Sequence, residues 1–446
     1  MKNIYVETLG CSKNQVDSEM MLGILDDYYG LAETAEEAEI IIVNTCSFIH
    51  DAQEESIDTI MGFASLKTDG ICEKLIVTGC LSQRYPDSLL DEIPEIDAIV
   101  GTGNFFKIVE VIEALDQGSK ERVFIESVDL LMPEDLPRIL TTPAHLAYIK
   151  IAEGCDNRCT YCIIPKLRGK YRSRTIEDIV DEVVYFVSCG VREIILIAQD
   201  TSRYGIDLYG KPYLTELLTA LNAIEDLKWI RVQYSYPDIL DDSLLDGFFK
   251  NDKVINYFDI PVQHASNRIL KLMNRKTSIE DLRSLIGKIR LRDENAVIRT
   301  TIIVGFPGET EEDFETLMNF VKEIKFDRLG AFTYSNEEGT PAYNLPDQLD
   351  EETKTERKDR LMTLQMGISE TLHLNKIGKI FEVVVEEIAE EGKILVGRSP
   401  FDSPEIDGVV YIHTELPIEM GTFVKVKITD ALEYDLIGEI ADEYRK

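Results

Sequence analysis

The chain has 446 residues, with 82 acidic and 47 basic side chains and a formal net charge of −35. This length allows two or three domains, each with its own core. A surface this acidic repels nucleic-acid phosphates over much of its area and attracts basic partners. We find no signal peptide in MKNIYVETLG, and apolar runs such as AEIIIVNTC are too short to span a bilayer, so we expect a cytoplasmic protein without membrane association.

Residues 1–117 are expected to form the first domain. Short β-branched runs alternate here with helical patterns, which predicts a parallel sheet with helices packed on it. The runs cover 3–11, 39–46, 74–80 and 98–103. Residues 118–143 contain three prolines and are expected to be an irregular linker.

The alternation resumes in the second domain, residues 144–375. Six strands are predicted, at 146–154, 192–200, 229–237, 257–265, 296–309 and 328–336. Six βα units without a glycine-rich dinucleotide fingerprint favour a complete or incomplete TIM-type barrel, with its chemistry at the carboxyl ends of the strands. A charged amphipathic helix over 349–375 follows the last strand.

Residues 376–446 are rich in short strands and predict a small β-barrel. This segment has 16 acidic and 8 basic side chains, which gives a net charge of −8. A barrel of this sign repels RNA and suits a basic protein partner.

Three of the eight cysteines each end a predicted strand of the first domain, namely Cys11, Cys46 and Cys80. The carboxyl ends of parallel strands meet at one edge of a sheet, where open α/β sheets bind ligands. Cys72 and Cys189 each precede a predicted strand. Each is therefore expected at the amino edge of its sheet, opposite the edge that carries the strand-ending cysteines. Taken alone, the first three also fit buried packing residues, a role that cysteine often has.

The segment EGCDNRCTYCIIP places Cys155, Cys159 and Cys162 in the loop after the first barrel strand. Three thiolates are too few for structural zinc, which prefers four ligands, but they suit a cubane iron–sulfur cluster with one iron left open. The alternatives are a zinc site completed by Asp156 or a distant histidine, or packing alone.

The segment CDNRCTYC resembles the signature of radical S-adenosylmethionine enzymes, including the aromatic Tyr161 before the last cysteine. The resemblance implies a partial barrel and an open iron that chelates S-adenosylmethionine, whose reductive cleavage gives a 5′-deoxyadenosyl radical. The whole chain is similar to the methylthiotransferases, which carry a second cluster in an amino-terminal domain and end in a TRAM β-barrel. This implies two 4Fe-4S clusters and makes Cys11, Cys46 and Cys80 ligands of the second one.

Two branches of that family differ in substrate. One modifies isopentenyl-adenosine in transfer RNA, and the RimO branch methylthiolates the β-carbon of an aspartate in a small-subunit ribosomal protein. The segments IPVQHAS, QDTSRYG and GRSPFDSPEIDG resemble the RimO branch. Ala198, where glycine is common, and YSYP at 234–237 depart from the pattern without touching a ligand.

Charge gives an independent argument for a protein substrate. The acidic run VEEIAEE in the last domain is a candidate contact for a basic ribosomal protein, through Glu386, Glu387, Glu390 and Glu391. The alternative is a solvated strand edge kept charged against aggregation. KLRGKYRSR (166–174), with five basic residues beside the cluster loop, is the one feature that favours RNA, and it also fits a solvated loop.

Other strand ends supply candidate cofactor-binding residues. Two glycines in IIVGFPGE would let the backbone approach adenine or ribose, although a simple tight turn explains them equally well. A lone histidine at such a position is more often structural than a ligand. The candidates are Tyr161, Gln199, Asp200, Gln263, His264, Gly305 and Gly308.

A non-enzymatic alternative is an iron–sulfur carrier or a ribosome-assembly adaptor. A carrier needs no cofactor-binding face, so binding of S-adenosylmethionine separates it from the enzyme. The enzyme also requires an electron donor, which we expect to be a flavodoxin- or ferredoxin-like protein.

Overall fold

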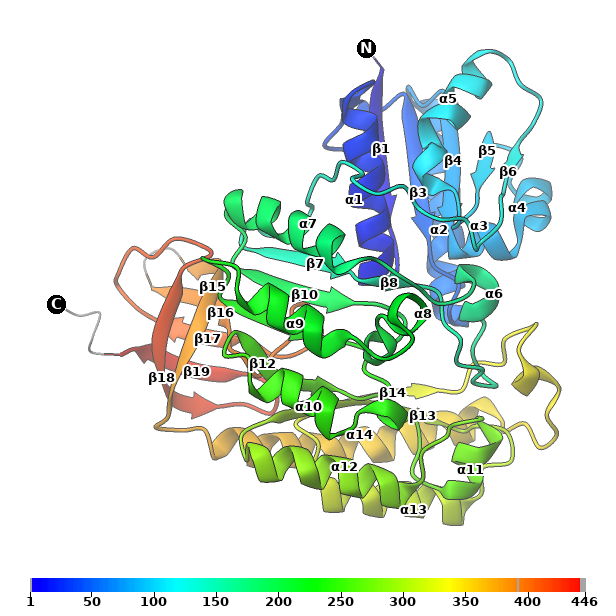
Figure 1. Cartoon of the computed structure of the whole chain (residues 1–446). Coiled ribbons are helices and arrows are strands. Elements are labelled where there is room, and N and C mark those ends of the chain that lie inside the picture. Colours follow the sequence, from blue (N-terminus) through cyan, green and yellow to red (C-terminus); the bar gives the residue numbers. More distant parts are fainter. Residues whose placement is uncertain (1, 391–392, 442–446) are drawn as a thin grey trace.

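The structure is a computed structural model that describes residues 2–390 and 393–441. An amino-terminal α/β unit stands over one end of a central α/β unit, and a small β-barrel closes the opposite end (Figure 1). The fold class predicted from the sequence is confirmed in all three parts. Among the described helices, none is both long and apolar enough to cross a membrane.

The first sheet is fully parallel, with strand order β2-β1-β3-β4-β5-β6. Every residue of β3 is buried, because helices cover both faces of the sheet and leave no solvent-facing side. The strands are β1 (Asn3–Thr8), β2 (Gly30–Leu31), β3 (Ile40–Thr45), β4 (Lys74–Gly79), β5 (Ala98–Val100) and β6 (Val123–Phe124). The helices are α1 (Ser12–Asp26), η1 (Ala35–Glu37), α2 (His50–Asp69), α3 (Cys80–Arg84), α4 (Pro86–Glu92), η2 (Phe105–Lys107) and α5 (Ile108–Asp116).

The segment 118–143, expected to be an irregular linker, contributes an edge strand to this sheet. In β6, Val123 and Phe124 pair in parallel with Ile99 and Val100. A strand of two residues leaves no alternation in the sequence, so pattern analysis passes over it.

The central sheet has the order β14-β13-β12-β11-β10-β7, with parallel pairs throughout. All six predicted strands are present. They are β7 (Leu146–Lys150), β10 (Glu193–Ile197), β11 (Trp229–Val232), β12 (Val254–Asp259), β13 (Val297–Val304) and β14 (Arg328–Thr333). The sheet does not close, since its first and last strands, β7 and β14, are not paired with each other. It is therefore a partial barrel.

Helices cover the outer face of this sheet, and α12 and α13 each begin with a capping box. The α-helices are α6 (Ile164–Arg168), α7 (Ile176–Ser188), α8 (Ile206–Tyr209), α9 (Leu214–Asn222), α10 (Asp242–Phe249), α11 (Asn267–Leu272), α12 (Ile279–Arg292), α13 (Glu311–Ile324) and α14 (Glu351–Leu374). The short elements are β8 (Ala152–Glu153), β9 (Arg172–Ser173), η3 (Thr201–Arg203), η4 (Pro237–Ile239) and η5 (Pro341–Asn344).

The carboxyl-terminal unit is a closed barrel with strand order β15-β16-β17-β19-β18. Buried and exposed residues alternate along β18, as expected where one face of a strand lines the barrel core. The strands are β15 (Ile380–Glu390), β16 (Ile394–Arg398), β17 (Val410–His413), β18 (Phe423–Ala431) and β19 (Leu436–Ile440).

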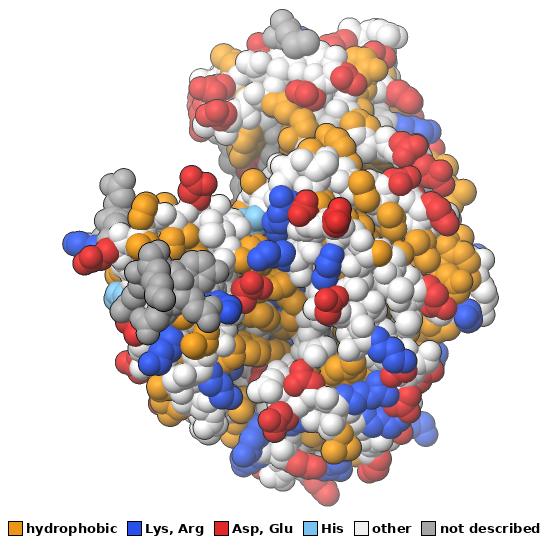
Figure 2. All heavy atoms as spheres, turned by 60° about the vertical axis from the view of Figure 1, so that its left-hand side comes forward, with side chains coloured by type: hydrophobic (Ala, Val, Ile, Leu, Met, Phe, Trp, Pro, Cys, Tyr) orange, Lys and Arg blue, Asp and Glu red, His pale blue; other side chains and the backbone are white. Residues whose placement is uncertain are grey.

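This barrel is attached to the amino ends of the central strands by buried ion pairs. Arg398 Nη2 lies 2.5 Å from Glu193 Oε2 at the start of β10. Arg328 at the start of β14 pairs with Asp402. Between them, Arg231 of β11 donates to the carbonyl of Pro400 at 3.1 Å. Figure 2 shows an indentation between the amino-terminal unit, at the top, and this barrel, at the left.

Candidate functional site

The three amino-terminal cysteines converge at the carboxyl edge of the first sheet. Cys11 is the N-cap residue of α1, Cys46 follows β3, and Cys80 begins α3. Two glycines make this convergence possible, because both have positive φ and no room for a side chain. A Cβ at Gly10 would lie 2.7 Å from the Cβ of Cys46, and one at Gly79 would lie 2.4 Å from the carbonyl oxygen of Thr45.

Burial favours the protonated thiol at two of these cysteines. It raises the pKa of Cys46 to about 12, and it also raises the pKa of the fully enclosed Cys80. Metals bind thiolates, so loading this site would release protons.

The second group of cysteines lies in the loop between β8 and α6, at the carboxyl end of the central sheet. Gly154 has a φ of +79°, and a Cβ there would lie 2.0 Å from the carbonyl oxygen of Lys170, so the loop requires glycine. The amide of Cys155 donates to the carbonyl of Gly169 at 3.1 Å. Cys159 Sγ lies 3.6 Å from the hydroxyl of Tyr236.

Neither group is arranged around a single ion. Two sulfurs bound to one zinc at about 2.3 Å can be no more than about 4.6 Å apart. Among the described residues, only the exposed side chains of His50, Asp51 and Glu54 bring three candidate ligand atoms within 4.8 Å of one another. Two sets of three thiols with wider spacing fit iron–sulfur clusters better than mononuclear zinc.

Arg168, at the end of α6, joins the two groups. Its Nη2 lies 3.7 Å from Cys80 Sγ and 2.5 Å from Asn14 Oδ1, and its Nη1 lies 2.6 Å from Asp17 Oδ2. The side chains of Cys80, Ile163 and Leu167 pack in one apolar cluster. Because α6 begins two residues after Cys162, Cys80 of the first group lies against the helix that follows the second group.

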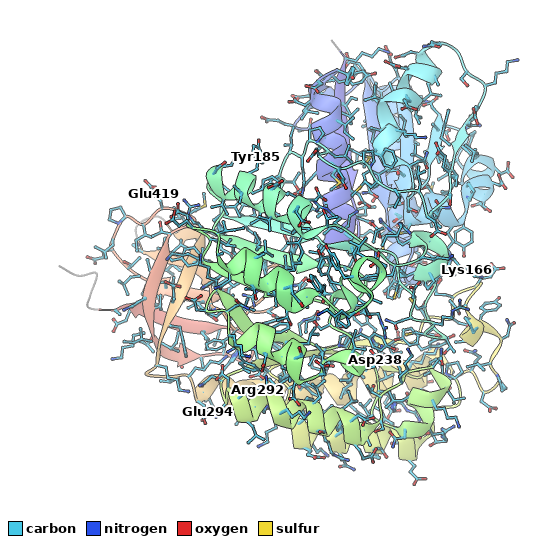
Figure 3. The ribbon with its side chains drawn as sticks, in the orientation of Figure 1. Lys166, Tyr185, Asp238, Arg292, Glu294 and Glu419 are labelled. Carbon is cyan, nitrogen blue, oxygen red and sulfur yellow. The ribbon has the colours of Figure 1, made fainter. Side chains whose placement is uncertain are left out.

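The basic segment 166–174 does not form a free cationic surface. Arg172 pairs with Asp129 at 3.2 Å, and Arg174 pairs with Asp178 and Glu182, each at 2.6 Å. Lys166 reaches from α6 toward the loop after β14, where its Nζ donates to the carbonyl of Gly339 at 2.8 Å (Figure 3). The segment joins parts of the protein, which removes the main sequence argument for RNA.

A cavity of about 130 Å³ lies between the amino-terminal unit and the central sheet. Gln263, at the carboxyl end of β12, lines it with a φ of +68° and a buried Oε1 that has no hydrogen-bond partner among the described residues. Tyr161, between two of the cysteines, lines it as well, and burial raises the pKa of its hydroxyl. The remaining lining residues are Phe48, Ile49, Thr301, Ile303, Phe332, Thr333, Tyr334, Ser335 and Glu337.

Glu337 fixes the amino-terminal unit over this cavity. Its Oε2 accepts from Arg84 Nη1 at 2.7 Å and from Gln53 Nε2 at 2.8 Å. Both sides of the Arg84–Glu337 pair are buried. No local pattern indicates this contact, because Arg84 and Glu337 lie about 250 residues apart along the chain.

At the end of β10, Gln199 and Asp200 have different surroundings. The Asp200 carboxylate is fully buried and accepts from Asn157 Nδ2 at 2.7 Å, from Ser202 Oγ at 2.5 Å and from Arg203 Nε at 3.1 Å. These bonds hold the cysteine loop to the strand end and leave little capacity for a cofactor. Gln199 donates to Glu153 at 2.7 Å, while its buried Oε1 has no partner among the described residues.

The remaining cofactor candidates have contacts that favour structural roles. His264 accepts from the amide of Ser266 at 2.9 Å, and its Nε2 lies 3.2 Å from Glu309. Gly305, expected to admit a cofactor, instead makes room for Lys354, whose Cγ would lie 2.4 Å from an added Cβ. Gly308 is open, with Arg268 3.8 Å from such an atom.

Of the four glutamates proposed as a substrate contact, Glu386 and Glu387 have described side chains, and their surroundings differ. Glu386 turns toward the central unit, where it lies 2.9 Å from Arg398 Nη2 and 3.3 Å from His145 Nε2, so it holds the barrel in place and is not a free carboxylate. Glu387 is exposed. Glu390 ends β15, and Glu391 lies outside the described residues.

Three family models match the chain, one in each unit. They are described as uncharacterized protein family UPF0004 (residues 3–101), the radical SAM superfamily (149–321) and the TRAM domain (377–441).

Two curated proteins are similar over almost the entire chain. The ribosomal protein uS12 methylthiotransferase RimO of Clostridioides difficile is 54% identical and covers 99% of this chain and 100% of its own length. The protein of the same name from Desulforamulus reducens is 51% identical, with the same coverage.

Among solved structures, the radical S-adenosylmethionine methyltransferase TsrM of Kitasatospora setae matches with a TM-score of 0.56 and 14% identity, over 76% of each chain. The cobalamin-dependent S-adenosylmethionine radical enzyme OxsB matches with a TM-score of 0.50 and 13% identity, over 82% of this chain and 56% of its own. At this identity the likeness concerns the fold.

Proposed function

Because the chain belongs to the RimO family of radical S-adenosylmethionine methylthiotransferases, we propose that it adds a methylthio group to the β-carbon of an aspartate in ribosomal protein uS12. The observation that carries this proposal is that Cys80, of the first triad, packs against α6, the helix that follows the second triad in the chain. A carrier of a single cluster would need only one of the triads.

We assign Cys155, Cys159 and Cys162 to the cluster that binds S-adenosylmethionine, and Cys11, Cys46 and Cys80 to a second 4Fe-4S cluster. The support is the number of thiols in each set, their position at the carboxyl ends of parallel strands, and a spacing too wide for one zinc ion. When bound, the first cluster and S-adenosylmethionine supply a 5′-deoxyadenosyl radical that removes hydrogen from the substrate carbon, while the second supports sulfur transfer.

The residues of the chain orient these groups and exclude water. Arg168 holds Cys80 against the barrel loop, and the buried Arg84–Glu337 pair keeps the amino-terminal unit over the barrel mouth. The cavity beneath the amino-terminal unit is lined by six apolar or aromatic side chains and five polar ones. Its volume of about 130 Å³ leaves little room for bulk water before the substrate arrives.

We place the reaction in the cytoplasm, where a ribosomal protein is found, and expect a flavodoxin- or ferredoxin-like electron donor. A chain with a net charge of −35 favours a basic protein substrate over RNA. Arg172 and Arg174 are already paired with acidic residues of the chain, which makes them less available to bind RNA phosphates. Of the acidic run in β15, Glu387 is the residue that we still propose as a substrate contact.

The test is anaerobic turnover of the reconstituted enzyme with S-adenosylmethionine, a reductant and uS12, followed by mass spectrometry. We expect one methylthio group on an aspartate, and deuterium placed on its β-carbon should appear in 5′-deoxyadenosine. Cys189→Ala, far from both triads, serves as the matched control and should retain turnover. Modified transfer RNA with unmodified uS12 in a parallel reaction would overturn the substrate assignment.

A further inference from the structure

Lys13 is a buried cation without a carboxylate partner among the described residues. It is the second residue of α1, two positions after Cys11, and is 8% exposed. The neighbouring buried cations at this domain boundary are all neutralised: Lys150 lies 2.9 Å from Glu153, and Arg168 lies 2.6 Å from Asp17. A cation that remains unpaired in such surroundings is costly unless a ligand supplies the missing charge.

The Lys13 ammonium lies over the ring of Tyr234, whose centroid is 3.2 Å from Nζ. Tyr234 follows β11 at the carboxyl end of the central sheet, with a φ of +60°. Its amide donates to Asp259 Oδ2 at 2.9 Å, and its carbonyl accepts from Thr201 at 3.0 Å. These bonds hold the backbone of Tyr234 at the barrel mouth, where its ring lies against the ammonium.

Unsatisfied polar atoms lie at the ends of the strands on either side of Tyr234. Gln199 follows β10 and Gln263 follows β12, and the Oε1 of each is buried without a hydrogen-bond partner among the described residues. Ser12 Oγ, beside Lys13, is also buried and unpartnered. Groups of this kind at the mouth of a barrel indicate a place for a polar ligand.

The position of Lys13 on α1 selects an anionic ligand. The first turn of α1 contains no acidic residue, and no side chain caps it. The positive end of the helix dipole therefore acts in the same direction as the ammonium. The thiolate of Cys11, assigned to the second cluster, shares this positive helix end, and a carboxylate is the further anion that the Lys13 ammonium would bind.

We infer that Lys13 binds the side-chain carboxylate of the aspartate that is modified, an inference that rests on the proposed function. The ammonium would hold the carboxylate and so direct the adjacent β-carbon toward the barrel cysteines. It would also make the enzyme prefer aspartate to asparagine. The carboxylate of S-adenosylmethionine has the same chemistry, and the experiment must distinguish the two sources.

The experiment measures the affinity of the reconstituted holoenzyme for two peptides, the target loop of uS12 with aspartate and the same loop with asparagine. Lys13→Met should weaken binding of the aspartate peptide about 30-fold and change the asparagine peptide less than about threefold, because only aspartate loses a charged partner. Lys13→Arg should restore most of the difference. Lys107→Met, an exposed lysine of the same unit paired with Glu126, should change neither affinity.

Equal losses for both peptides in Lys13→Met would overturn the inference while wild-type turnover stands. Weaker binding of S-adenosylmethionine in the absence of peptide would also overturn it, because the carboxylate would then be that of the cofactor. Failure of the wild-type enzyme to bind or modify the aspartate peptide would overturn the proposed function together with the inference.

Discussion

Arg168 donates to the sulfur of Cys80 across a domain boundary, with Nη2 3.7 Å from Sγ. The same guanidinium is bound to Asp17 and Asn14, so its position is fixed by three groups of the amino-terminal unit. An arginine from the barrel thus completes the surroundings of a thiol that belongs to the other sheet. The surroundings of Cys80 therefore depend on side chains from both the amino-terminal unit and the central unit.

Replacing Arg168 with Met should therefore lower the stability of the protein and change the reduction potential of the second cluster. Loss of a buried ion pair should destabilise the protein by about 3 kcal/mol. Loss of a hydrogen bond and a positive charge beside Cys80 should make the reduction potential of the second cluster more negative. Chemical denaturation and a potentiometric titration followed by electron paramagnetic resonance measure the two effects.

The matched control is Arg172→Met in the same segment, where the partner Asp129 is largely exposed. Solvent screens the pair through Asp129, although Arg172 also donates to the carbonyls of Lys170 and Arg168, so this variant should lose less stability than Arg168→Met and leave the reduction potential unchanged. An unchanged potential in Arg168→Met would show that the contact with Cys80 has no electronic role.

Removing either triad should remove one cluster. Substituting Ala for Cys155, Cys159 and Cys162 together should eliminate about half the iron and abolish cleavage of S-adenosylmethionine. The equivalent triple substitution in the first unit should eliminate the other half and abolish sulfur insertion, while cleavage persists. Iron analysis and chromatography of 5′-deoxyadenosine measure these outcomes.

Cys72 and Cys189 provide the controls for that experiment. Cys72 lies before β4, with its thiol against the carbonyl of Lys74, and Cys189 is an exposed residue at the end of α7. Either one changed to Ser should leave the iron content unaltered. Loss of a whole cluster in either variant would refute the assignment of ligands by strand end.

Gly154→Ala should disrupt the barrel loop selectively. The added methyl would meet the carbonyl of Lys170 at 2.0 Å, and a φ of +79° is unfavourable for alanine, so we expect a cost of at least about 2 kcal/mol. Iron bound at the barrel site should fall, while the amino-terminal site remains loaded. Gly287→Ala in α12 is the control, since open space surrounds it and alanine favours a helix.

His373 should make the stability depend on pH. Its Nε2 accepts from Arg328 Nη1 at 2.8 Å, so the ring is neutral and Nδ1–H donates to the carbonyl of Leu432. Burial, reinforced by the charge of Arg328, lowers the pKa of the ring from 6.5 to about 4. The unfolded chain therefore binds more protons between these values, and stability should be lost as pH falls through this window.

The expected loss between pH 6.5 and pH 4 is about 3 kcal/mol. Glutamine can accept from Arg328 and donate to Leu432 without titrating, so His373→Gln should show a smaller decline over the same range. Comparison of unfolding midpoints of the two proteins across this range gives the measurement. Parallel curves for both would exclude His373 as the source.

Several features of the site were predictable because they depend on chain order and strand direction. The alternation of β-branched runs with helical patterns located all six central strands. Parallel strands share their carboxyl edge, which predicts that Cys11, Cys46 and Cys80 lie together, as they do. In both cases the information lies in short stretches of sequence.

Contacts between distant segments could not be predicted in this way. Gly305 makes room for Lys354 of a later helix, a neighbour that no local pattern indicates. Glu386 illustrates the same limit. Its acidic run predicts an exposed charge, but the side chain lies at a domain boundary, where it contacts Arg398 and His145. Hydrophobicity and charge identify a surface strand, but they do not reveal which neighbouring domain covers it.

The ion pairs between the carboxyl-terminal barrel and the central sheet have a mechanical consequence. An open sheet of six strands has two free edges, so nothing within it fixes the distance between them. Residues 398–402 connect Glu193, near one edge of the sheet, with Arg328, at the other edge. They thereby limit how far the two edges can separate and how strongly the sheet can curve. Removal of this barrel would let the edges move apart and misalign the strand ends at the far side, where the cysteines lie.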